Sequence, residues 1–341
     1  MKAELLSLVK TNGGDPATLR KHCMVQPLAG DASTRSYFRL RLGATSAVLM
    51  RLPEHRPASE GFLAGQVRAL TGEQAFLAVR DLLASCEVPT LEIVAQDLPG
   101  RWLLLSDLGD DLLLDRLEAE PSSAGHWYRK ALGNLDRMQR SATSGLRALA
   151  GPRYTEALLH WELEHFLQYG LGHSFPEHTP QGLALELLSL APRLAKLPTT
   201  FTHRDYHCRN LMVYRDELHV IDFQDALLGP STYDLASLLR DSYLLLEEAL
   251  VDELVVEFHE RTILPVIPSW SLARFVEDFH LTALQRNLKA WGRFRFFSLE
   301  RGNDAYLRYI PTTIRQIKRF ARFYNELDRV LTAHCEEYRR I

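Results

Sequence analysis

Short apolar stretches separated by turn-forming residues make up the first part of the chain. Three of them are rich in β-branched and aromatic side chains and span residues 22–29, 35–42 and 46–52. The sequences Gly-Asp-Ala-Ser and Gly-Ala-Thr, which are typical of turns, separate them. Apolar stretches of this length between turn residues predict strands, so we expect a three-strand meander here.

The periodicity then changes from that of strands to that of a helix. Phe76 and Val79 belong to a set of apolar residues at helical spacing within residues 72–86, as on the buried face of an amphipathic helix. Two further extended stretches, 91–95 and 101–106, follow. The N-terminal unit is therefore predicted to run β-β-β-α-β-β.

In the rest of the chain, apolar residues recur mostly at intervals of three or four, which is typical of helices that bury one face. This pattern covers six segments: 126–140, 155–169, 182–196, 232–261, 271–291 and 311–337. One stretch, 211–223, instead holds two short apolar runs around a polar centre and predicts a hairpin. We therefore expect an α+β protein with a small β-rich lobe in residues 1–105, a hinge near 105–110 and a larger helical lobe in residues 111–341.

Composition and charge narrow the class of protein. The 341 residues are 46% hydrophobic and 24% charged, with a formal net charge of −3, which excludes a disordered or fibrous chain. A charge this close to zero makes nucleic acid and anionic membranes poor expected partners. Four cysteines lie far apart without a C-x-x-C pair, which favours a reducing compartment. No stretch resembles a signal peptide or a membrane span, so we expect a cytoplasmic protein.

The strongest chemical signal is the segment 203–210, His-Arg-Asp-Tyr-His-Cys-Arg-Asn, followed by Asp222 in Val-Ile-Asp-Phe. Asp205 and Asn210 lie on an expected tight loop, and Asp222 lies on the adjacent hairpin. These three oxygen-bearing side chains can converge. Carboxylate and amide oxygens suit magnesium, which prefers hard ligands, while Asp205 can accept a proton from a hydroxyl nucleophile.

An isolated D-x-x-x-x-N pattern is weak evidence, since composition alone should produce about one in a chain of this length. The preceding His203 and the apolar hairpin with Asp222 reduce the expected number of chance matches by roughly several thousand-fold. The competing interpretation is a polar turn in which Asp205 and Asn210 are only turn formers. A zinc site on His203 and His207 is a further alternative, but the pair lacks the Glu of H-E-x-x-H.

The segment 203–210 resembles the H-x-D-x-x-x-x-N catalytic loop of the aminoglycoside phosphotransferase family of kinase-like enzymes. Ile221-Asp222-Phe223 resembles the metal-binding segment of that family. The likeness covers most of the chain and implies the two-lobed protein-kinase-like fold. It implies that Asp205 is the catalytic base, and that Asn210 and Asp222 bind Mg²⁺.

The same resemblance assigns supporting roles around the loop. His203 would be a structural member of the catalytic loop. Residues 229–236 match the family's G-P-x-x-x-D-x-A element. In that element Asp234 would brace the catalytic loop through backbone contacts, without touching substrate.

Five segments resemble one branch of the family more closely, the anomeric amino-sugar kinases of peptidoglycan recycling. They are residues 30–39, 48–50, 203–207, 221–226 and 233–241. Enzymes of this branch use ATP to phosphorylate N-acetylmuramate and N-acetylglucosamine at the anomeric hydroxyl. The resemblance implies an amino-sugar acceptor, ATP and Mg²⁺ for this chain, which we expect to act as a monomer or weak homodimer. Another acceptor, such as choline, homoserine or an aminoglycoside, remains an alternative, as does a non-catalytic nucleotide-binding module.

The expected nucleotide site lies between the lobes. The hinge would hold adenine through backbone groups at Leu105 and Asp107. The loop that would cover the phosphates consists of Gly30, Asp31, Ala32, Ser33, Thr34 and Arg35. One glycine in place of G-x-G-x-x-G is a weak phosphate signal, and an ordinary hairpin turn is the alternative.

Two positions depart from the family pattern. The third-strand lysine that clamps the α- and β-phosphates in kinase-like folds falls on Met50 by register. The branch usually carries an acid at the next position, where this chain has Arg51. Regular alternation would point Arg51 to the face opposite Met50. Arg35 and Arg39 are the other candidates for the missing charge, and we favour Arg35 because it closes the loop.

Residues 284–301 interleave basic and aromatic side chains. Such mixing occurs in nucleic-acid binding, whereas the simplest interpretation is an amphipathic helix with buried aromatics and solvated arginines. A third interpretation is a surface for the acceptor, because the family builds its acceptor pocket from helices of the C-lobe. Candidate acceptor-binding residues are Arg204, His207, Gln224, Asp225, Arg286, Asn287 and Lys289.

Overall fold

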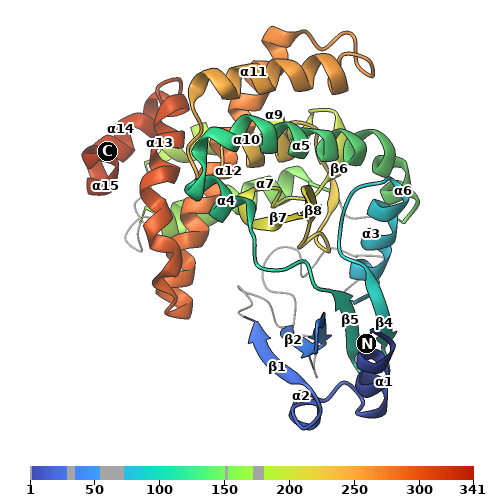
Figure 1. Cartoon of the computed structure of the whole chain (residues 1–341). Helices are drawn as coiled ribbons and strands as arrows, with labels where there is room; N and C mark the ends of the chain where they lie inside the picture. The colour runs from blue at the N-terminus through green and yellow to red at the C-terminus, as the bar shows by residue number, and fades with distance from the viewer. Residues whose placement is uncertain (1, 29–34, 54–72, 150–152, 172–179) are drawn as a thin grey trace.

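The computed structural model of the chain describes residues 2–28, 35–53, 73–149, 153–171 and 180–341. Figure 1 shows a small lobe built on a sheet and a larger lobe made mostly of helices. This is the two-lobed α+β arrangement predicted from the pattern of apolar residues. The phosphate loop predicted at Gly30, Asp31, Ala32, Ser33 and Thr34 lies outside the described residues.

An antiparallel sheet with strand order β1-β2-β3-β5-β4 forms the small lobe. Its strands are β1 (Met24–Leu28), β2 (Ser36–Leu42), β3 (Thr45–Arg51), β4 (Ile93–Asp97) and β5 (Trp102–Ser106). Strands β1 to β3 form the predicted meander. Between β2 and β3, Gly43 has a φ of 59°, a conformation that glycine adopts at no steric cost. The predicted helix between β3 and β4 is also present, as α3 (Glu73–Ser85).

The two faces of this sheet pack against different parts of the protein. Leu49 and Trp102 lie on the outer face, in an apolar cluster with α1 (Lys2–Thr11). Met50 and Leu103 lie on the opposite face and join the main core, which also includes α3. Because successive strand residues point to opposite sides of a sheet, neighbours in β3 belong to separate cores.

Two short N-terminal helices were not predicted. Helix α1 covers the outer face of the sheet with Leu5 and Val9, and α2 (Pro16–Leu19) follows it. The carboxylate of Asp15 caps α2 by accepting two backbone N–H groups of its first turn. Both helices are too short for periodicity to distinguish them from turns, and tertiary packing against the sheet stabilises α1.

Helices make up most of the larger lobe. They are α4 (Leu113–Ala119), α5 (Ala124–Arg137), α6 (Thr143–Ala148), α7 (Glu156–His165), α8 (Gln181–Leu188), α9 (Leu190–Ala195), α10 (Tyr233–Leu239), α11 (Glu248–Phe258), α12 (Leu272–Arg301), α13 (Ile310–Ala321), α14 (Asn325–His334) and α15 (Glu336–Arg340). Short π-helical or 3₁₀ turns extend or link them: η2 (Pro121–Ser123), η3 (Met138–Ala142), η4 (Phe166–Gly170), η5 (Cys208–Asn210), η6 (His259–Ile263) and η7 (Asp304–Tyr309).

The predicted hairpin within 211–223 is present as β7 (Leu211–Tyr214) and β8 (Glu217–Val220). A second pair, β6 (Thr199–Thr202) and β9 (Leu227–Pro230), was not predicted. Each strand of that pair has four residues, and the strands meet only because the segment between them folds back. Residues so far apart in sequence pair through tertiary structure, which local periodicity does not report.

The single helix predicted over 232–261 is wrong. Helix α10 ends at Leu239, and α11 starts only at Glu248. The side chain of Asp241, between them, accepts hydrogen bonds from the backbone N–H groups of Cys208 and Tyr243. It therefore helps to hold the segment 203–210 and is not part of a helix. In contrast, α12 is longer than predicted and ends at Gly302, whose φ is 62°.

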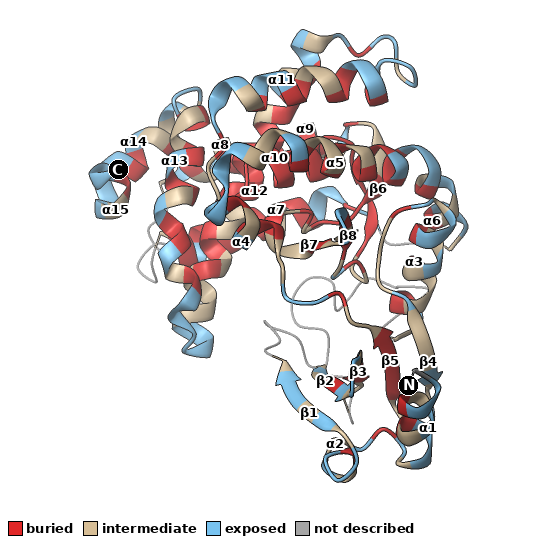
Figure 2. Ribbon diagram, viewed as in Figure 1, coloured by how far each residue is buried: buried red, intermediate tan, exposed pale blue. Residues whose placement is uncertain are grey.

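The main core lies where α5, α10 and α12 run close together in the large lobe, and Figure 2 shows buried residues concentrated there. The hairpin β7–β8 lies on the side of this core that faces the small lobe (Figure 1). Thr90, from the small lobe, donates its hydroxyl to the carbonyl of Val220 at 2.7 Å. Within the described part of the chain, no helix combines the length and apolarity needed to cross a membrane.

Candidate active site

The segment 203–210 connects β6 to β7, and α10 holds its first residues in place. The backbone N–H groups of His203 and Arg204 donate to the two carboxylate oxygens of Asp234, at 2.6 and 3.0 Å. Asp234 lies buried in the first turn of α10. These contacts have the geometry that the family resemblance implies for a bracing aspartate, whose role in turnover stays a prediction.

The buried position of Asp234 changes its proton affinity. Burial raises the pKa of Asp234 to about 6, against the lowering effect of His203 and of the two N–H groups. At neutral pH the carboxylate is therefore ionised and accepts both hydrogen bonds. If the carboxyl group were protonated, one of its oxygens would carry a hydrogen, and Asp234 would lose one of the two hydrogen bonds that it accepts.

Three further contacts hold the catalytic loop. The Nε2 atom of His203 lies 2.9 Å from the carbonyl oxygen of Ile221, and the hydroxyl of Tyr206 donates to the carbonyl of Ala131 at 2.8 Å. The backbone N–H of Cys208 donates to Asp241 at 3.1 Å. Sequence reasoning missed Asp241, although a charged residue inside a predicted buried helix is a signal that the helix ends.

The two predicted metal ligands lie on adjoining segments. The backbone N–H of Ile221, next to Asp222, donates to the carbonyl of Asn210 at 3.1 Å. The side-chain amide N–H of Asn210 donates to the carbonyl of Asp205 at 2.9 Å, so the side-chain oxygen is the atom of Asn210 that could bind a metal. Asp222 is exposed, and one of its oxygens accepts the amide of Gln224 at 2.8 Å. Two oxygen donors of this kind fit Mg²⁺.

Asp222 also has a strained backbone. Its φ is 60°, in the left-handed region that costs a residue with a Cβ about 1 kcal/mol or more. Contacts on both sides fix the segment, since Ile221 binds Asn210 and the ring of Phe223 stacks on Phe76 at 5.1 Å. Strain of this kind is retained where the surrounding structure requires one direction for a side chain.

The carboxylate of Asp205 lies among cations from its own loop and from α12. Its side chain is 45% exposed, and Arg286 approaches it to 4.0 Å. Desolvation raises the pKa of Asp205, but the charges of Lys289, Arg204 and Arg286 outweigh it and hold the pKa below its usual range. Asp205 is therefore ionised at neutral pH and can accept a hydrogen bond from a hydroxyl.

A second carboxylate, which sequence reasoning missed, lies among the same cations. Glu162, on α7, has a fully buried side chain. Lys289 lies 3.1 Å from it and Arg204 3.7 Å. Desolvation raises the pKa of Glu162, but the charges of Lys289 and Arg204 outweigh it and hold the pKa below its usual value, so Glu162 is ionised. The signal that could have identified Glu162 from the sequence is its position, since it is a glutamate on the apolar face of a predicted helix.

The structure brings only some of the predicted acceptor-binding residues together. Arg204, Arg286 and Lys289 gather near Asp205. Asn287 is not brought together with them, because it is buried and its amide is occupied by the carbonyl of Arg240 at 2.9 Å and the hydroxyl of Ser242 at 2.9 Å.

The remaining candidates lie around the catalytic loop. The ring of His207 packs edge-on against Tyr243, with centroids 4.9 Å apart, and burial lowers the pKa of His207. Gln224 binds Asp222, and the charge of Asp225 acts on Arg204. No role in substrate binding follows from these contacts alone.

The hinge after β5 is tied to the sheet by Arg39, on β2. Arg39 forms salt bridges with Asp107 at 2.9 Å and Asp110 at 2.8 Å, and donates to the carbonyl of Gly109 at 2.8 Å. Leu105 is buried in the main core, so only its backbone is available to a nucleotide. Sequence reasoning placed Arg39 among the candidates for phosphate charge, but its partners place it at the hinge.

The three other positions discussed for phosphate binding have distinct surroundings. Met50 is fully buried in the main core. Arg51 lies on the opposite face, as strand alternation predicts, and donates to the carbonyls of Gly13 and Gly100 at 3.2 and 3.1 Å. The guanidinium of Arg35 lies over the ring of Phe76, 5.4 Å from its centroid.

The basic and aromatic stretch 284–301 lies entirely in α12. Trp291 and Phe294 are buried, while Arg293 lies over the rings of Phe296 and Phe297 at 4.7 and 4.8 Å. The stretch is therefore a helix that packs one face into the core and also carries cations near Asp205. This arrangement is compatible with both the amphipathic-helix interpretation and the acceptor-site interpretation.

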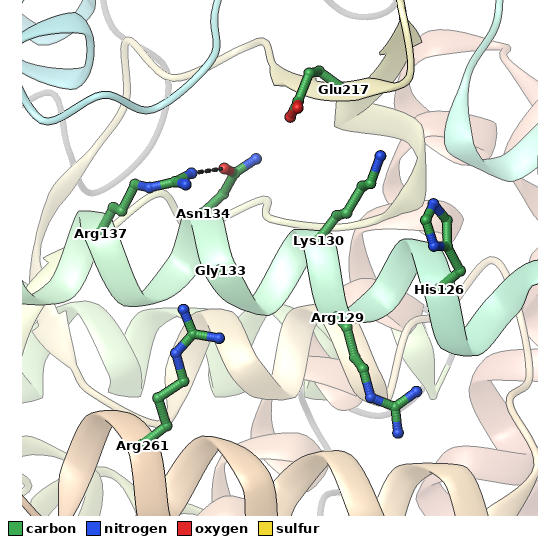
Figure 3. Close-up of a pocket in the computed structure, with 8 residues that line it drawn as sticks. All are labelled: His126, Arg129, Lys130, Gly133, Asn134, Arg137, Glu217 and Arg261. Atoms are coloured by element: carbon green, nitrogen blue, oxygen red, sulfur yellow. Dashed lines mark hydrogen bonds between the residues drawn. The ribbon is translucent and has the colours of Figure 1, made fainter.

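A cavity of about 400 Å³ lies beside α5. Its lining residues, drawn in Figure 3, include none of the predicted site residues. Several lining residues are basic, but they have acidic partners: Arg129 binds Glu253, and Lys130 binds Asp216 at 2.9 Å. Another, Arg137, donates to Asn134 at 2.9 Å. Because its cations are largely neutralised, this cavity gives no signal for an anionic ligand.

The chain is similar over most of its length to known phosphotransferases. The model of the phosphotransferase enzyme family matches residues 24–270. An N-acetylmuramate/N-acetylglucosamine kinase from Pseudomonas aeruginosa is 33% identical over 303 residues, covering 86% of this chain and 82% of the relative. An N-acetylmuramate/N-acetylglucosamine kinase from Neisseria meningitidis is 30% identical over 307 residues, covering 88% of this chain and 86% of the relative.

Solved structures share the fold at low sequence identity. The choline kinase LicA from Streptococcus pneumoniae has a TM-score of 0.59 at 12% identity, covering 93% of this chain and 100% of that chain. The GDP complex of aminoglycoside 2'-phosphotransferase-IIIa has a TM-score of 0.59 at 13% identity, covering 95% of this chain and 99% of that chain. The predicted resemblance and two-lobed fold are thus confirmed, and the chain belongs to the phosphotransferase enzyme family.

Proposed function

We propose that this enzyme is an ATP-dependent kinase that transfers the γ-phosphoryl group of ATP to the anomeric hydroxyl of N-acetylmuramate or N-acetylglucosamine. The observation that carries the proposal is that Asp205, Asn210 and Asp222 lie on adjoining segments, joined by the bond from the Asn210 side-chain amide to the carbonyl of Asp205 and by the bond from the backbone N–H of Ile221 to the carbonyl of Asn210. The choice of acceptor rests on the names of the curated relatives and on the cations around Asp205.

In the proposed mechanism the nucleotide lies between the lobes, with its adenine against the backbone of the hinge at Leu105 to Asp107. Asn210 and Asp222 would hold Mg²⁺ with their side-chain oxygens. When bound, the ion would neutralise negative charge on the phosphates. Arg35, whose guanidinium lies over Phe76 in the core cluster that also contains Met50, would supply the charge that a third-strand lysine supplies in other kinase-like folds.

Asp205 would orient the acceptor hydroxyl and take its proton. Because its pKa is held low, its main contribution is the orienting hydrogen bond, and the proton moves once the oxygen has begun to bond to phosphorus. Phosphoryl transfer has a loose transition state in most analyses, so positioning of this kind accounts for most of the rate.

The charge around Asp205 favours a neutral or anionic acceptor. Arg204, Arg286 and Lys289 all have raised pKa values, because their acidic neighbours outweigh desolvation, and they remain charged. A lactyl carboxylate on the acceptor would be attracted to them, whereas a polycationic aminoglycoside would be repelled. The unpaired cysteines fit the reducing cytoplasm that we propose as its location.

A transfer screen tests the proposal. The enzyme is incubated with Mg²⁺–ATP and one of N-acetylmuramate, N-acetylglucosamine, choline or kanamycin, and the position of the new phosphate is read by NMR. We expect anomeric phosphorylation of the two amino sugars. Transfer to choline or kanamycin alone would rule out the amino-sugar acceptor, and ATP binding without transfer to any of them would favour a non-catalytic module.

A further inference from the structure

Glu162 is a buried anion that binds two cations of the active site. Its side chain has no exposed surface, whereas Lys289 and Arg204 keep 14% and 11% of theirs. Lys289 lies 3.1 Å from the Glu162 carboxylate, and Arg204 lies 3.7 Å from it. Lys289 and Arg204 are therefore partly exposed to solvent, whereas the carboxylate that binds them is not.

The rest of the Glu162 environment is also built to hold a charge. The hydroxyl of Tyr154 donates to one carboxylate oxygen, and the amide of Gln285 donates to the same oxygen at 2.9 Å. Tyr154 in turn contacts the hydroxyl of Tyr233 at 2.8 Å, which also accepts a hydrogen bond from Lys289 at 3.1 Å. Helices α7, α10 and α12, the segment just before α7 and the segment 203–210 thus meet around this one side chain.

A buried ion pair of this kind is a poor way to stabilise a protein. Removing two charges from water costs several kcal/mol per ion, and apolar replacements of similar size are often as stable or more so. The pair of Glu162 and Lys289 is therefore better explained by an effect on the neighbouring side chains than by a contribution to the stability of the fold.

The neighbour most affected is Asp205. The charges of Lys289 and Arg204 both act on Asp205, yet both side chains are bound to Glu162. In the described part of the chain, the salt bridge of Asp205 is a long one, 4.0 Å from Arg286. Asp205 thus experiences positive charge without a close ion pair that would occupy its oxygens.

The backbone conformation of Arg204 indicates that an arginine side chain is needed at this position. Its φ is 80°, in the left-handed region where glycine is the favoured residue. The chain carries a buried arginine at this strained position, with its guanidinium near Glu162 and 6.0 Å from the ring centre of Tyr154. The strain is tolerated because the loop is fixed by the bonds to Asp234.

We propose that Glu162 is a positioning residue of the active site, which binds Lys289 and Arg204 so that their charges act on Asp205 without pairing with it directly. This inference rests on the proposed phosphotransferase function. With Glu162 in place, an oxygen of Asp205 is available to accept the hydrogen bond of the acceptor hydroxyl. Without its charge, Lys289 turns toward Asp205, the next carboxylate near it, and occupies that oxygen.

The first test is the substitution Glu162→Gln in the full chain, which removes the charge and keeps the shape. Steady-state kinetics with the acceptor found in the transfer screen give kcat and KM, and calorimetry gives the Kd of ATP. We expect kcat to fall at least thirtyfold while the Kd of ATP stays within twofold. Glu162→Asp, which keeps the charge, should recover part of kcat, and Glu164→Gln, at an exposed position on the same helix, should leave all values unchanged.

The second test combines Glu162→Gln with Lys289→Met. The proposal predicts opposite effects of Lys289→Met in the two backgrounds: it lowers kcat in the wild type and raises it in Glu162→Gln, because it removes the group that blocks Asp205. If Glu162→Gln does not fold, the double variant is compared with Lys289→Met, and their kcat values should agree within threefold. A purely structural role would not produce this sign reversal.

Three results would overturn the inference. One is a folded Glu162→Gln with the kcat of the wild type; another is a loss of kcat that is matched by an equal loss of ATP binding. The third is a double variant at least tenfold slower than Lys289→Met. Failure of the proposed acceptor is seen separately, as a wild-type enzyme that transfers no phosphate to either amino sugar, and the variants are then compared on the acceptor that it does use.

Discussion

The guanidinium of Arg39 lies 2.9 Å from the carboxylate of Asp107, in a salt bridge whose two side chains are 3% and 7% exposed. It joins strand β2 to the hinge between the lobes. Because the hinge backbone is the proposed adenine contact, this pair links the stability of the small lobe to the geometry of nucleotide binding.

Replacing Arg39 should therefore affect both properties. Arg39→Ala removes the cation that pairs with the buried carboxylate of Asp107, so we expect the free energy of unfolding to fall by about 3 kcal/mol. The Kd of ATP should rise about tenfold as the hinge loses its position. Urea unfolding and calorimetry measure the two effects. Arg41→Ala, at an exposed position of the same strand, is the matched control, and equal effects of both substitutions would contradict the prediction.

Asp205→Asn should abolish most of the turnover and leave nucleotide binding intact. The amide has the size of the carboxylate but cannot take a proton, and loss of a general base typically costs 10²- to 10⁴-fold, so we expect a fall in kcat of about 10³-fold. The Kd of ATP should change less than threefold. Asp216→Asn, at the exposed tip of the hairpin, should keep the activity of the wild type. Full turnover by Asp205→Asn would remove Asp205 from the mechanism.

Activity should fall as the pH drops through about 6, because Asp234 then becomes protonated and loses one of its bonds to the catalytic loop. The stability effect has the opposite sign. The pKa of Asp234 is raised on folding from 3.8 to about 6, so the folded state binds the proton more tightly, and this contribution to stability is lost as the pH rises through that window.

The pH dependence of kcat/KM between pH 5 and 8 measures the first effect, after circular dichroism shows that the enzyme is folded throughout. Asp234→Asn provides the comparison for stability, since it removes the titrating group and should flatten the contribution of this position to the pH dependence of unfolding. A kcat/KM that does not change between pH 5 and 7 would refute the proposed coupling.

Arg35 and Arg51 should respond differently to removal of their charge. The guanidinium of Arg35 lies over Phe76, which belongs to the same core cluster as Met50, whereas Arg51 binds the carbonyls of Gly13 and Gly100. Arg35→Ala is expected to raise the Kd of ATP at least tenfold with little change in the Kd of adenosine. Arg51→Ala should leave both within twofold. The reverse order would move the missing phosphate charge to Arg51.

Local patterns were sufficient where a single segment carries its own signal. The alternation of β2 and β3, the helical period of α3 and the spacing of Asp205 and Asn210 all depend on neighbours in sequence, so the strands, the helix and the loop could be predicted. They failed where a distant side chain decides the local structure, as Asp241 does when it binds Cys208 and interrupts the predicted helix.

The sequence by itself determined the two-lobed class and the family, and it predicted the catalytic segment, because these depend on local periodicity and on the order of residue types along the chain. Only the tertiary structure placed Glu162 beneath Lys289 and Arg204, and Arg39 against Asp107. Each of those pairs joins residues far apart in sequence. Their partners are selected by burial, since a charge removed from water needs an opposite charge wherever the packed chain supplies one.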